Sequence, residues 1–258
     1  MATLTGAVQL ALFAATGNTT QLTSSGVTIY SVDNQQYEYV SDFSDGGDYL
    51  VVNDGVSRVY LNDQLGTSLI AGDDSVYITV TDSYGNNKIL AGDGNNTIYL
   101  SGGADAVRLG NGNNAVDTGA GNDTVTAGDG NNTIITGQGN DLVTVGKGNN
   151  IISAGDGNDV VRVVGDGSGT NYIDAGKGND FISLVAGTGR DTLVKGSVSG
   201  EIDTVTGFDT ARDKIATGSD TVTSTVISGS DTVVTFSDGS QLTLIGVQIS
   251  DSASFVVS

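Results

Sequence analysis

A nine-residue repeat fills the middle of this chain and constrains its fold more than any other feature. Reading in nines from residue 82, units such as TGAGNDTVT (118–126) and AGDGNNTII (127–135) follow one another to Val194, with insertions of three and of two residues. Each unit has Gly at its fourth position, Asp or Asn at its sixth and an apolar residue at its eighth. Such self-similarity predicts a solenoid, in which each unit packs against its neighbours.

The eighth position of the units predicts short buried strands. It holds Ile, Val or Leu throughout, and every one except Leu193 is β-branched, which suits a half-buried pleated surface. One apolar residue in nine cannot support an ordinary core, so the strands must stack. The glycines at the second and fourth positions permit backbone angles that other residues avoid and leave carbonyl groups uncovered. The sixth position then supplies an oxygen-bearing side chain just before the strand.

These units resemble the repeats-in-toxin (RTX) family, whose nonapeptide reads G-G-x-G-x-D-x-U-x, with U a large apolar residue. The resemblance covers residues 82–194, with a weaker echo in AGDDSVYI at 71–78. It implies an all-β fold, a right-handed parallel β-roll with two nonapeptides per turn, and multiple Ca²⁺ ions between stacked turns. The first position is usually Ala, Thr, Leu or Val where the family has Gly, so the carbonyl ligands can differ from the family's set.

The resemblance also implies which residues hold calcium: sixth-position carboxylates and the carbonyl groups of loop glycines. The carboxylates are Asp105, Asp123, Asp141, Asp159, Asp180 and Asp191. The glycines are Gly103, Gly119, Gly121, Gly137, Gly139, Gly155, Gly157, Gly176 and Gly178. Weaker metal ligands, or members of an amide ladder, are Asn96, Asn114, Asn132, Asn150 and Asn171.

The alternation of Asp and Asn between successive units then acquires a meaning. With two units per turn, residue i lies about 4.8 Å from residue i+18, so the Asp residues from Asp105 to Asp180 line one edge and the Asn residues line the other. Unit charges at that spacing repel by about 1 kcal/mol in water and by more at lower dielectric, whereas stacked amides can form a hydrogen-bonded ladder. We therefore expect calcium to fill the Asp edge tightly and the Asn edge weakly or not at all. The alternative is that Asn tunes affinity, because amide oxygens also bind calcium.

The flanking segments divide the chain into residues 1–81, the roll at 82–194, and residues 195–258. In the N-terminal β-rich segment, a cap or assembly region, GVTIYSV, QQYEYV, DYLVV and SRVYLND predict strands of a β-sandwich or of an irregular solenoid. Its six tyrosines between Tyr30 and Tyr77 favour core packing over a contact surface. Residues 1–16 predict a capping helix or a first strand rather than a signal peptide, because the first basic residue is Arg58.

The C-terminal segment resembles the part that follows RTX arrays in exported proteins. IDTVTGFDTARDKI (202–215) resembles a roll-closing segment, and residues 231–247 predict a hairpin around Ser237-Asp238-Gly239. The end, DSASFVVS, resembles a type I secretion signal; the alternative is simply a last strand. The resemblance implies export by the type I secretion machinery and folding outside the cell, where calcium is available.

Composition narrows the classes of function. The net charge of −20, from 30 acidic and 10 basic residues, leaves no basic footprint for nucleic acid and disfavours anionic membrane surfaces. It fits either calcium binding or a solvated acidic surface. No window approaches a membrane span. The absence of Cys and His removes the usual zinc and iron ligands and Ser-His-Asp or Cys-His catalysis, so we expect no enzymatic activity.

These features together predict a secreted, extracellular or cell-surface calcium-binding structural protein that folds and self-associates on binding calcium, as in an S-layer, sheath, filament or biofilm matrix. The alternative is a calcium-dependent extracellular binding module or adhesin. Late in the array the outward seventh position becomes apolar, which indicates either a partner contact or a surface covered by the C-terminal tail. Those residues are Leu142, Ile151, Val160, Tyr172 and Phe181.

Overall fold

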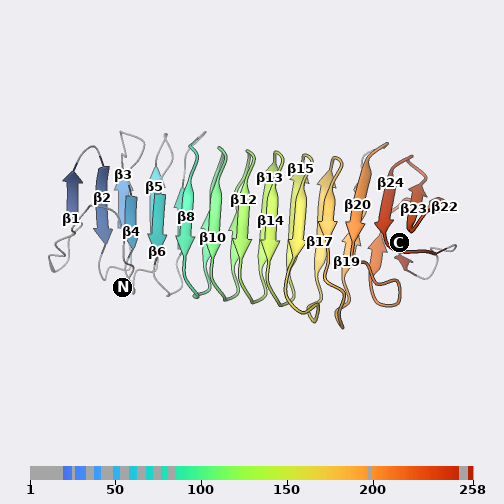
Figure 1. The fold of residues 1–258 in the computed structure, drawn as a ribbon. Helices are drawn as coiled ribbons and strands as arrows, with labels where there is room; N and C mark the ends of the chain where they lie inside the picture. Colours follow the sequence, from blue (N-terminus) through green and yellow to red (C-terminus); the bar gives the residue numbers. More distant parts are fainter. Residues whose placement is uncertain are drawn as a thin grey trace.

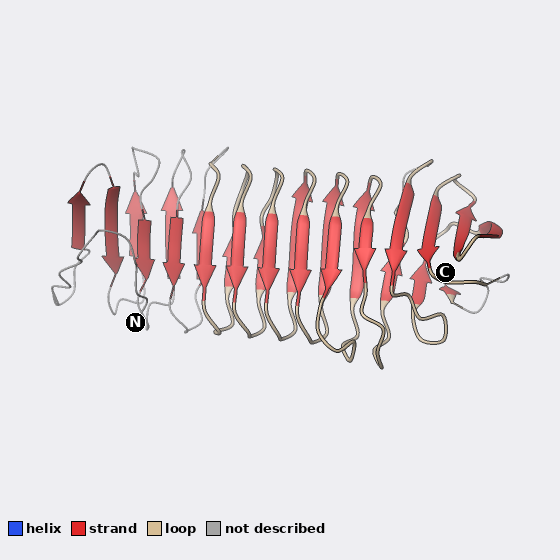
Figure 2. Ribbon diagram, viewed as in Figure 1, coloured by secondary structure: helices blue, strands red, loops and turns tan. Residues whose placement is uncertain are grey.

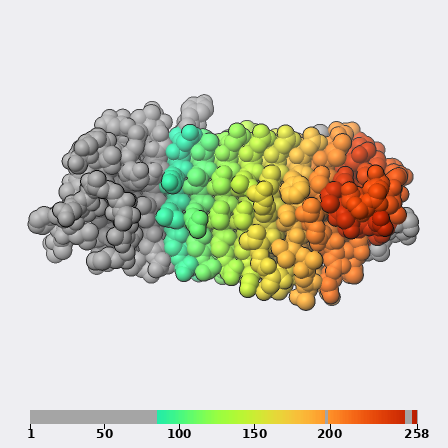
Figure 3. All heavy atoms as spheres, viewed as in Figure 1, coloured from blue at the N-terminus to red at the C-terminus, as the bar shows by residue number. Residues whose placement is uncertain are grey.

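The computed structural model describes residues 85–196, 199–249 and 255–257, together with the backbone of strands lying between residues 20 and 80. Its regular elements are strands that stack side by side into an elongated body, with the chain advancing steadily from one end to the other (Figures 1 and 2). The space-filling view shows the same advance as successive bands along the body (Figure 3). A helix with the length and apolar character needed to span a membrane is not found in the described ranges.

Two sheets form the body. The larger has fourteen strands in the order β1-β2-β4-β6-β8-β10-β12-β14-β16-β18-β20-β24-β23-β22. Their bounds are β1 Thr20–Ser24, β2 Val27–Val32, β4 Tyr49–Val52, β6 Ser68–Ala71, β8 Lys88–Ala91, β10 Ala106–Leu109, β12 Thr124–Ala127, β14 Leu142–Val145, β16 Val160–Val163, β18 Phe181–Ser183, β20 Ile202–Thr206, β24 Gln241–Ile245, β23 Asp231–Phe236 and β22 Val222–Ser228. We call it sheet A.

The smaller sheet, sheet B, has eleven strands in the order β25-β21-β19-β17-β15-β13-β11-β9-β7-β5-β3. Their bounds are β25 Val256–Val257, β21 Lys214–Ala216, β19 Thr192–Val194, β17 Tyr172–Lys177, β15 Ile151–Asp156, β13 Thr133–Gln138, β11 Ala115–Asp117, β9 Thr97–Tyr99, β7 Tyr77–Val80, β5 Arg58–Asn62 and β3 Glu38–Ser41. From β2 to β21, even strands lie in sheet A and odd strands in sheet B. Each pair of units therefore makes one turn of a parallel β-solenoid, as the resemblance implies.

The pairing register follows the repeat. Within sheet A, Val107 pairs with Val125 and Val125 with Val143, so eighth-position residues stack on one another at intervals of 18. Within sheet B, Ile152 pairs with Ile173, so the three-residue insertion is absorbed without loss of phase. Residues at the same position of the unit consequently lie next to one another in successive turns.

The core is filled by two residues of most units rather than one. The eighth-position side chains are fully buried, as predicted, and most first-position side chains, two residues further along the strand, point the same way. Buried first-position residues include Ala91, Leu100, Leu109, Thr118, Ala127, Thr136, Val145, Ala154 and Ala175; Leu184, in the two-residue insertion, takes the equivalent place after Ile182. The residues that depart from the family's glycine thus supply a second apolar row, which explains how a repeat with so few large side chains builds a core.

The loop glycines are required by the stacking of the turns. At Gly121 the backbone has φ of +140°, and a Cβ added there would lie 1.8 Å from the carbonyl oxygen of Gly103 in the preceding turn. Both the backbone angle and the close approach exclude a side chain. The same contact recurs one turn later between Gly139 and Gly121.

The N-terminal strands belong to the solenoid and not to a β-sandwich. Strands β2, β4 and β6 continue sheet A in parallel, and β3, β5 and β7 continue sheet B. Four predicted strands coincide with β2 to β5. Residues 1–16 and the side chains of the tyrosines from Tyr30 to Tyr77 lie outside the described residues.

Beyond the array, both sheets continue before the roll is capped. Strand β20 adds to sheet A and β21 to sheet B, both in parallel. Strands β23 and β24 then form the predicted antiparallel hairpin, and β22 pairs antiparallel with β23 at the end of sheet A. The last strand, β25, pairs with β21, and the buried Phe255 ring packs edge-on against Phe208 with centroids 5.5 Å apart.

The apolar seventh-position side chains lie on the outer faces of the roll. Ile151 and Tyr172, which pair with one another on sheet B, are 54% and 46% exposed, and Phe181 on sheet A is 36% exposed. The described part of the C-terminal segment therefore leaves this strip open.

Candidate metal site along one edge of the roll

The sixth-position residues of the units stack into two buried columns, one on each edge of the roll. The column that precedes the strands of sheet A contains Asn87, Asp105, Asp123, Asp141, Asp159, Asp180 and Asp203; we call it the acidic column. The column that precedes the strands of sheet B contains Asn96, Asn114, Asn132, Asn150, Asn171, Asp191 and Asp213; we call it the amide column. None of these residues is more than 8% exposed.

Both columns share one hydrogen bond per turn. The backbone N–H of each sixth-position residue donates to the side-chain Oδ1 of the next residue in its column. Asp123 N lies 2.7 Å from Asp141 Oδ1, and Asn132 N lies 3.1 Å from Asn150 Oδ1. The first side-chain oxygen is therefore used in the same way on both edges, and the columns differ in the second atom.

In the amide column the second atom is satisfied. Asn132 Nδ2 donates to the carbonyl oxygen of Gly130 at 3.1 Å and to Asn150 Oδ1 at 2.9 Å. Asn114 Nδ2 makes the equivalent bonds to Gly112 and Asn132, at 3.1 and 2.9 Å. The amide ladder predicted for this edge is thus present, and its donors already occupy the loop carbonyls.

For the carboxylates of the acidic column from Asp123 to Asp180, the second atom has no such partner. The Oδ2 atoms of four carboxylates are buried without a hydrogen bond: Asp123, Asp141, Asp159 and Asp180. The nearby hydroxyls of Thr118 and Thr136 donate to carbonyl oxygens of the following turn, at 3.2 and 3.0 Å. They still lie close enough to Asp123 and Asp141 to lower the pKa of each carboxyl, by less than burial raises it.

Asn87, at the head of the acidic column, shows what surrounds that second atom. Its Nδ2 donates to the carbonyl of Gly85, two residues before it, at 3.0 Å and to Asp105 Oδ1 at 3.1 Å. A carboxylate at the same place has Oδ2, an acceptor, in place of this donor. Oδ2 then faces two other acceptors, the glycine carbonyl and the Oδ1 of the next Asp. Such a group needs a cation or a proton, because burying an unpaired carboxylate costs several kcal/mol.

The acid–base properties of the acidic column follow from this burial. Burial raises the pKa of Asp123 and of Asp141, against hydrogen bonds that lower it. Burial, with added repulsion from neighbouring carboxylates, raises the pKa of Asp159 to about 6 and that of Asp180 to about 7. The carboxylate form is therefore held at a cost that a bound cation offsets.

The donor set fits calcium. Carboxylate and carbonyl oxygens are the ligands that Ca²⁺ prefers, and the column offers both at every turn. Within the described residues no three acidic side chains already converge on one point. A bound ion would therefore draw on Asp side chains from adjacent turns and on carbonyl oxygens of the loops.

The predicted glycine ligands occupy two kinds of position in these loops. The fourth-position glycines (Gly103, Gly121, Gly139, Gly157 and Gly178) stand two residues before their Asp, where Gly85 stands before Asn87. Second-position glycines continue the strands: Gly137 pairs with Gly155 and Gly155 with Gly176, and Gly119 O accepts the N–H of Gln138 at 3.0 Å. Metal ligation by either set remains a prediction.

Three acidic residues at the edges of the roll were not anticipated from the sequence. A fourth, Asp191, was anticipated but lies in the amide column. Asp203 and Asp213 extend the two columns past Val194, and Glu201 enters the acidic edge. IDTVT at 202–206 repeats the NDTVT of 122–126, which is the signal that could have revealed Asp203. Asp191 stacks in the amide column, where its Oδ1 accepts both the N–H and the Nδ2–H of Asn171.

Comparison with known proteins identifies the repeat. Residues 81–116, 109–143 and 135–162 match the family described as RTX calcium-binding nonapeptide repeat (4 copies). No curated protein matches the chain by sequence. Among solved structures, the extracellular lipase LipA from Serratia marcescens is similar over 85% of this chain and 42% of the lipase, with 13% identity and a TM-score of 0.25. The chain thus spans less than half of that lipase.

Proposed function

Because residues 81–162 are RTX calcium-binding nonapeptide repeats, which bind multiple Ca²⁺ ions, we propose that this chain is an extracellular structural protein whose fold is completed by calcium at its acidic column. The observation that carries the proposal is the row of buried Oδ2 atoms without partners at Asp123, Asp141, Asp159 and Asp180. Bound Ca²⁺ would supply the positive charge that this row lacks.

Calcium binding is proposed for the acidic edge alone. In the amide column the Nδ2 groups of Asn96, Asn114, Asn132 and Asn150 already donate to a loop carbonyl and to the next Oδ1, so an ion there would have to displace hydrogen bonds that the fold makes without it. At Asp123, Asp141, Asp159 and Asp180 no bond of this kind competes. Asn96, Asn114, Asn132, Asn150 and Asn171 are accordingly assigned to register and stability rather than to metal binding.

The proposed setting is outside the cell. A chain whose acidic column repels itself stays unfolded where calcium is scarce and folds where calcium is plentiful, since any ligand that binds only the folded state stabilises it. Export by the type I secretion machinery, with a signal in the C-terminal tail, is consistent with that coupling. The tail's Phe255 and β25 also serve the folded roll, so one segment would have both roles.

Self-association is the proposed next step after folding. What supports it is the outer face of sheet B, where Ile135, Ile151 and Tyr172 are 43%, 54% and 46% exposed. Exposed apolar strips of this kind are typical of contact surfaces. A surface layer, sheath, filament or matrix would use a strip on a repetitive rod in this way; an adhesin would use it for a foreign ligand.

A calcium titration of calcium-stripped protein tests the proposal, read by circular dichroism and multi-angle light scattering. We expect a transition from coil to strand, followed by a rise in mass. Folding to a monomer of constant mass would contradict self-association and leave the binding module. A strand spectrum that is complete without calcium and unchanged by it would contradict the calcium-dependent fold.

A further inference from the structure

The acidic column ends in a loop unlike those within it. Along the acidic edge from Gly103 to Gly157, the N–H of the fourth-position glycine donates to a backbone carbonyl of the next turn: for example, Gly139 to Asp156 at 2.7 Å and Gly157 to Lys177 at 2.8 Å. At the last such glycine, Gly178, the acceptor is the carboxylate Oε1 of Glu201, at 2.8 Å. Glu201 therefore takes the place of a loop carbonyl and brings a charge with it.

The second oxygen of Glu201 is left without a partner inside the protein. Glu201 Oε2 is buried and accepts no hydrogen bond. A Cβ placed on Gly196 would lie 2.9 Å from this atom and 2.5 Å from the carbonyl oxygen of Gly176, so both oxygens border the space left by the absent side chain. That space is lined by acceptors.

A second unpartnered oxygen belongs to the same loop. Asp180 is 2% exposed, and its Oδ2 has no hydrogen bond. The equivalent second atom of Asn87 contacts the Gly85 carbonyl and Asp105 Oδ1. We therefore infer that Asp180 Oδ2 faces the Gly178 carbonyl and Oδ1 of Asp203, the next member of the column. Asp180 N donates to that Oδ1 at 3.0 Å. Both orphaned oxygens thus border the loop of Gly176 and Gly178.

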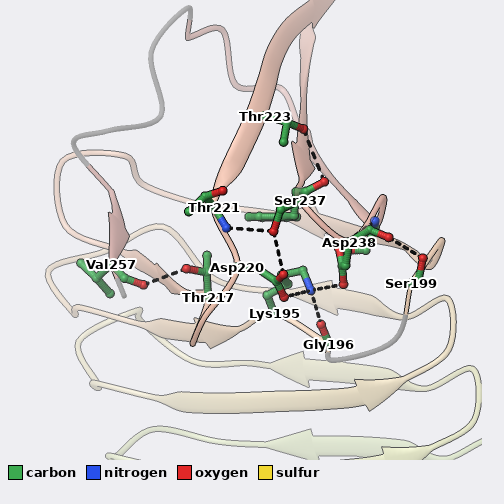
Figure 4. Close-up of polar contacts among 12 residues, drawn as sticks. Lys195, Gly196, Ser199, Thr217, Asp220, Thr221, Thr223, Ser237, Asp238 and Val257 are labelled. Carbon is green, nitrogen blue, oxygen red and sulfur yellow. Dashed lines mark hydrogen bonds and ion pairs between the residues drawn. The ribbon is translucent and has the colours of Figure 1, made fainter.

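The charge at this end is not balanced by the nearest lysine. Repulsion from Glu201 raises the pKa of both Asp180 and Asp203, after burial as the main cause. The buried Lys195 donates to Asp238 at 2.6 Å, to Asp220 at 3.0 Å and to the Gly196 carbonyl at 2.6 Å (Figure 4). Its ammonium joins the roll to the capping strands and moderates the pKa of Asp203 only through its field.

We propose that Asp180, Glu201 and the Gly176 carbonyl, with Asp203 adjacent, form a separate terminal site for a divalent cation, and that it binds Ca²⁺ more tightly than the sites within the array. Glu201 supplies a carboxylate where each interior turn supplies only a neutral carbonyl, and calcium affinity rises with the number of charged ligands. The site lies beyond the matched repeats, and it rests on the proposed function only in taking calcium as the cation.

Calorimetric titration of calcium-stripped full-length chain with calcium alone tests the site, using Glu201→Gln. We expect the tightest ion of the wild type to bind about tenfold or more weakly in this variant, with the weaker set unchanged. Asp166→Asn removes one exposed charge on the opposite edge and serves as the control; it should titrate as wild type does.

A steric variant keeps the test decisive if Glu201→Gln fails to fold at saturating calcium. Gly196→Ala retains every carboxylate but fills the space beside Glu201 Oε2, and it should weaken the same single ion. Loss of that ion in either variant supports the terminal site. Unchanged tight binding in both overturns it while leaving the proposed function intact, and a wild type that binds no calcium contradicts the proposed function itself.

Discussion

The two edges of the roll share a backbone rung and differ by one atom in each turn. Asp141 and Asn132 both accept an N–H at Oδ1, yet Asn132 carries a donor at its second position, whereas Asp141 carries an acceptor. The amide edge therefore closes its hydrogen bonds without help, and the acidic edge does not. Asn and Asp have the same shape and differ only in carrying NH₂ or O⁻ at this position. That difference decides whether the ladder is complete by itself or requires a cation.

The comparison gives each edge a distinct role. The amide ladder fixes the register of the turns in the folded roll without help from a cation, because its bonds join side chains 18 residues apart in sequence. The acidic column makes the stacking of the turns depend on the calcium concentration. The folding of a roll with two acidic edges would depend more strongly on calcium, and a roll with two amide edges would fold without it.

Making both edges of the roll alike should have the largest effect on its dependence on calcium. The five array carboxylates Asp105, Asp123, Asp141, Asp159 and Asp180 would be changed together to Asn. Asn87 already shows that an amide fits this column, so we expect the variant to adopt a strand spectrum without calcium. Circular dichroism of calcium-stripped protein measures this, and a variant that still needs calcium to fold would contradict the account.

A single charge placed in the amide column should have the next largest effect. Asn132→Asp sets an oxygen against the carbonyl of Gly130 and against Asn150 Oδ1, where a donor stood. We expect it to lower the free energy of unfolding by about 3 kcal/mol or more in the absence of calcium. Thermal unfolding of calcium-stripped wild type and variant, both folded by a stabilising osmolyte, provides the measurement; equal midpoints would show that the ladder matters little.

The reverse exchange at one turn should have opposite effects with and without calcium. Asp141→Asn gives the buried second atom a donor, so it should stabilise calcium-stripped protein by about 1–3 kcal/mol. With calcium present the same variant should lose bound metal and stability. Thermal unfolding with calcium, and without calcium in a stabilising osmolyte that folds the stripped chains, tests this reversal of sign. Destabilisation in both conditions would argue that the carboxylate has partners other than a cation.

The smallest expected effect is that of protons standing in for calcium. Because the pKa values of Asp159 and Asp180 are raised to about 6 and about 7, the calcium-free folded chain binds more protons than the unfolded chain above about pH 4. Its stability should therefore fall as pH rises through that window. Thermal unfolding of stripped wild type, folded by the same osmolyte, should show this slope. The five-fold Asn variant should show a shallower one, because it loses the raised pKa values of Asp159 and Asp180 but retains others, such as that of Asp203.

Much of this architecture was predictable because the repeat carries its own phase. The spacing of 18 places Asp123 beside Asp141 and Asn114 beside Asn132, and the three-residue insertion before Asn171 keeps both columns intact. The burial of the first position was not predicted, although Leu100 and Val145 occupy it, because only the eighth position is apolar in every unit.

The end of the acidic column could be predicted only in part. IDTVT repeats an array unit and marks Asp203. Glu201 has no counterpart in any unit, and its contact with Gly178 depends on how the irregular segment before it returns to the roll. Such a contact comes from the path of the backbone, which no local pattern specifies.

The most direct test is the position of calcium itself. A crystal structure of the chain grown with calcium, with anomalous difference maps to locate the ions, would compare the two edges in one molecule. The account predicts peaks along the acidic column between Asp105 and Asp203 and none beside Asn114, Asn132 or Asn150. Peaks of equal height along both edges would contradict it.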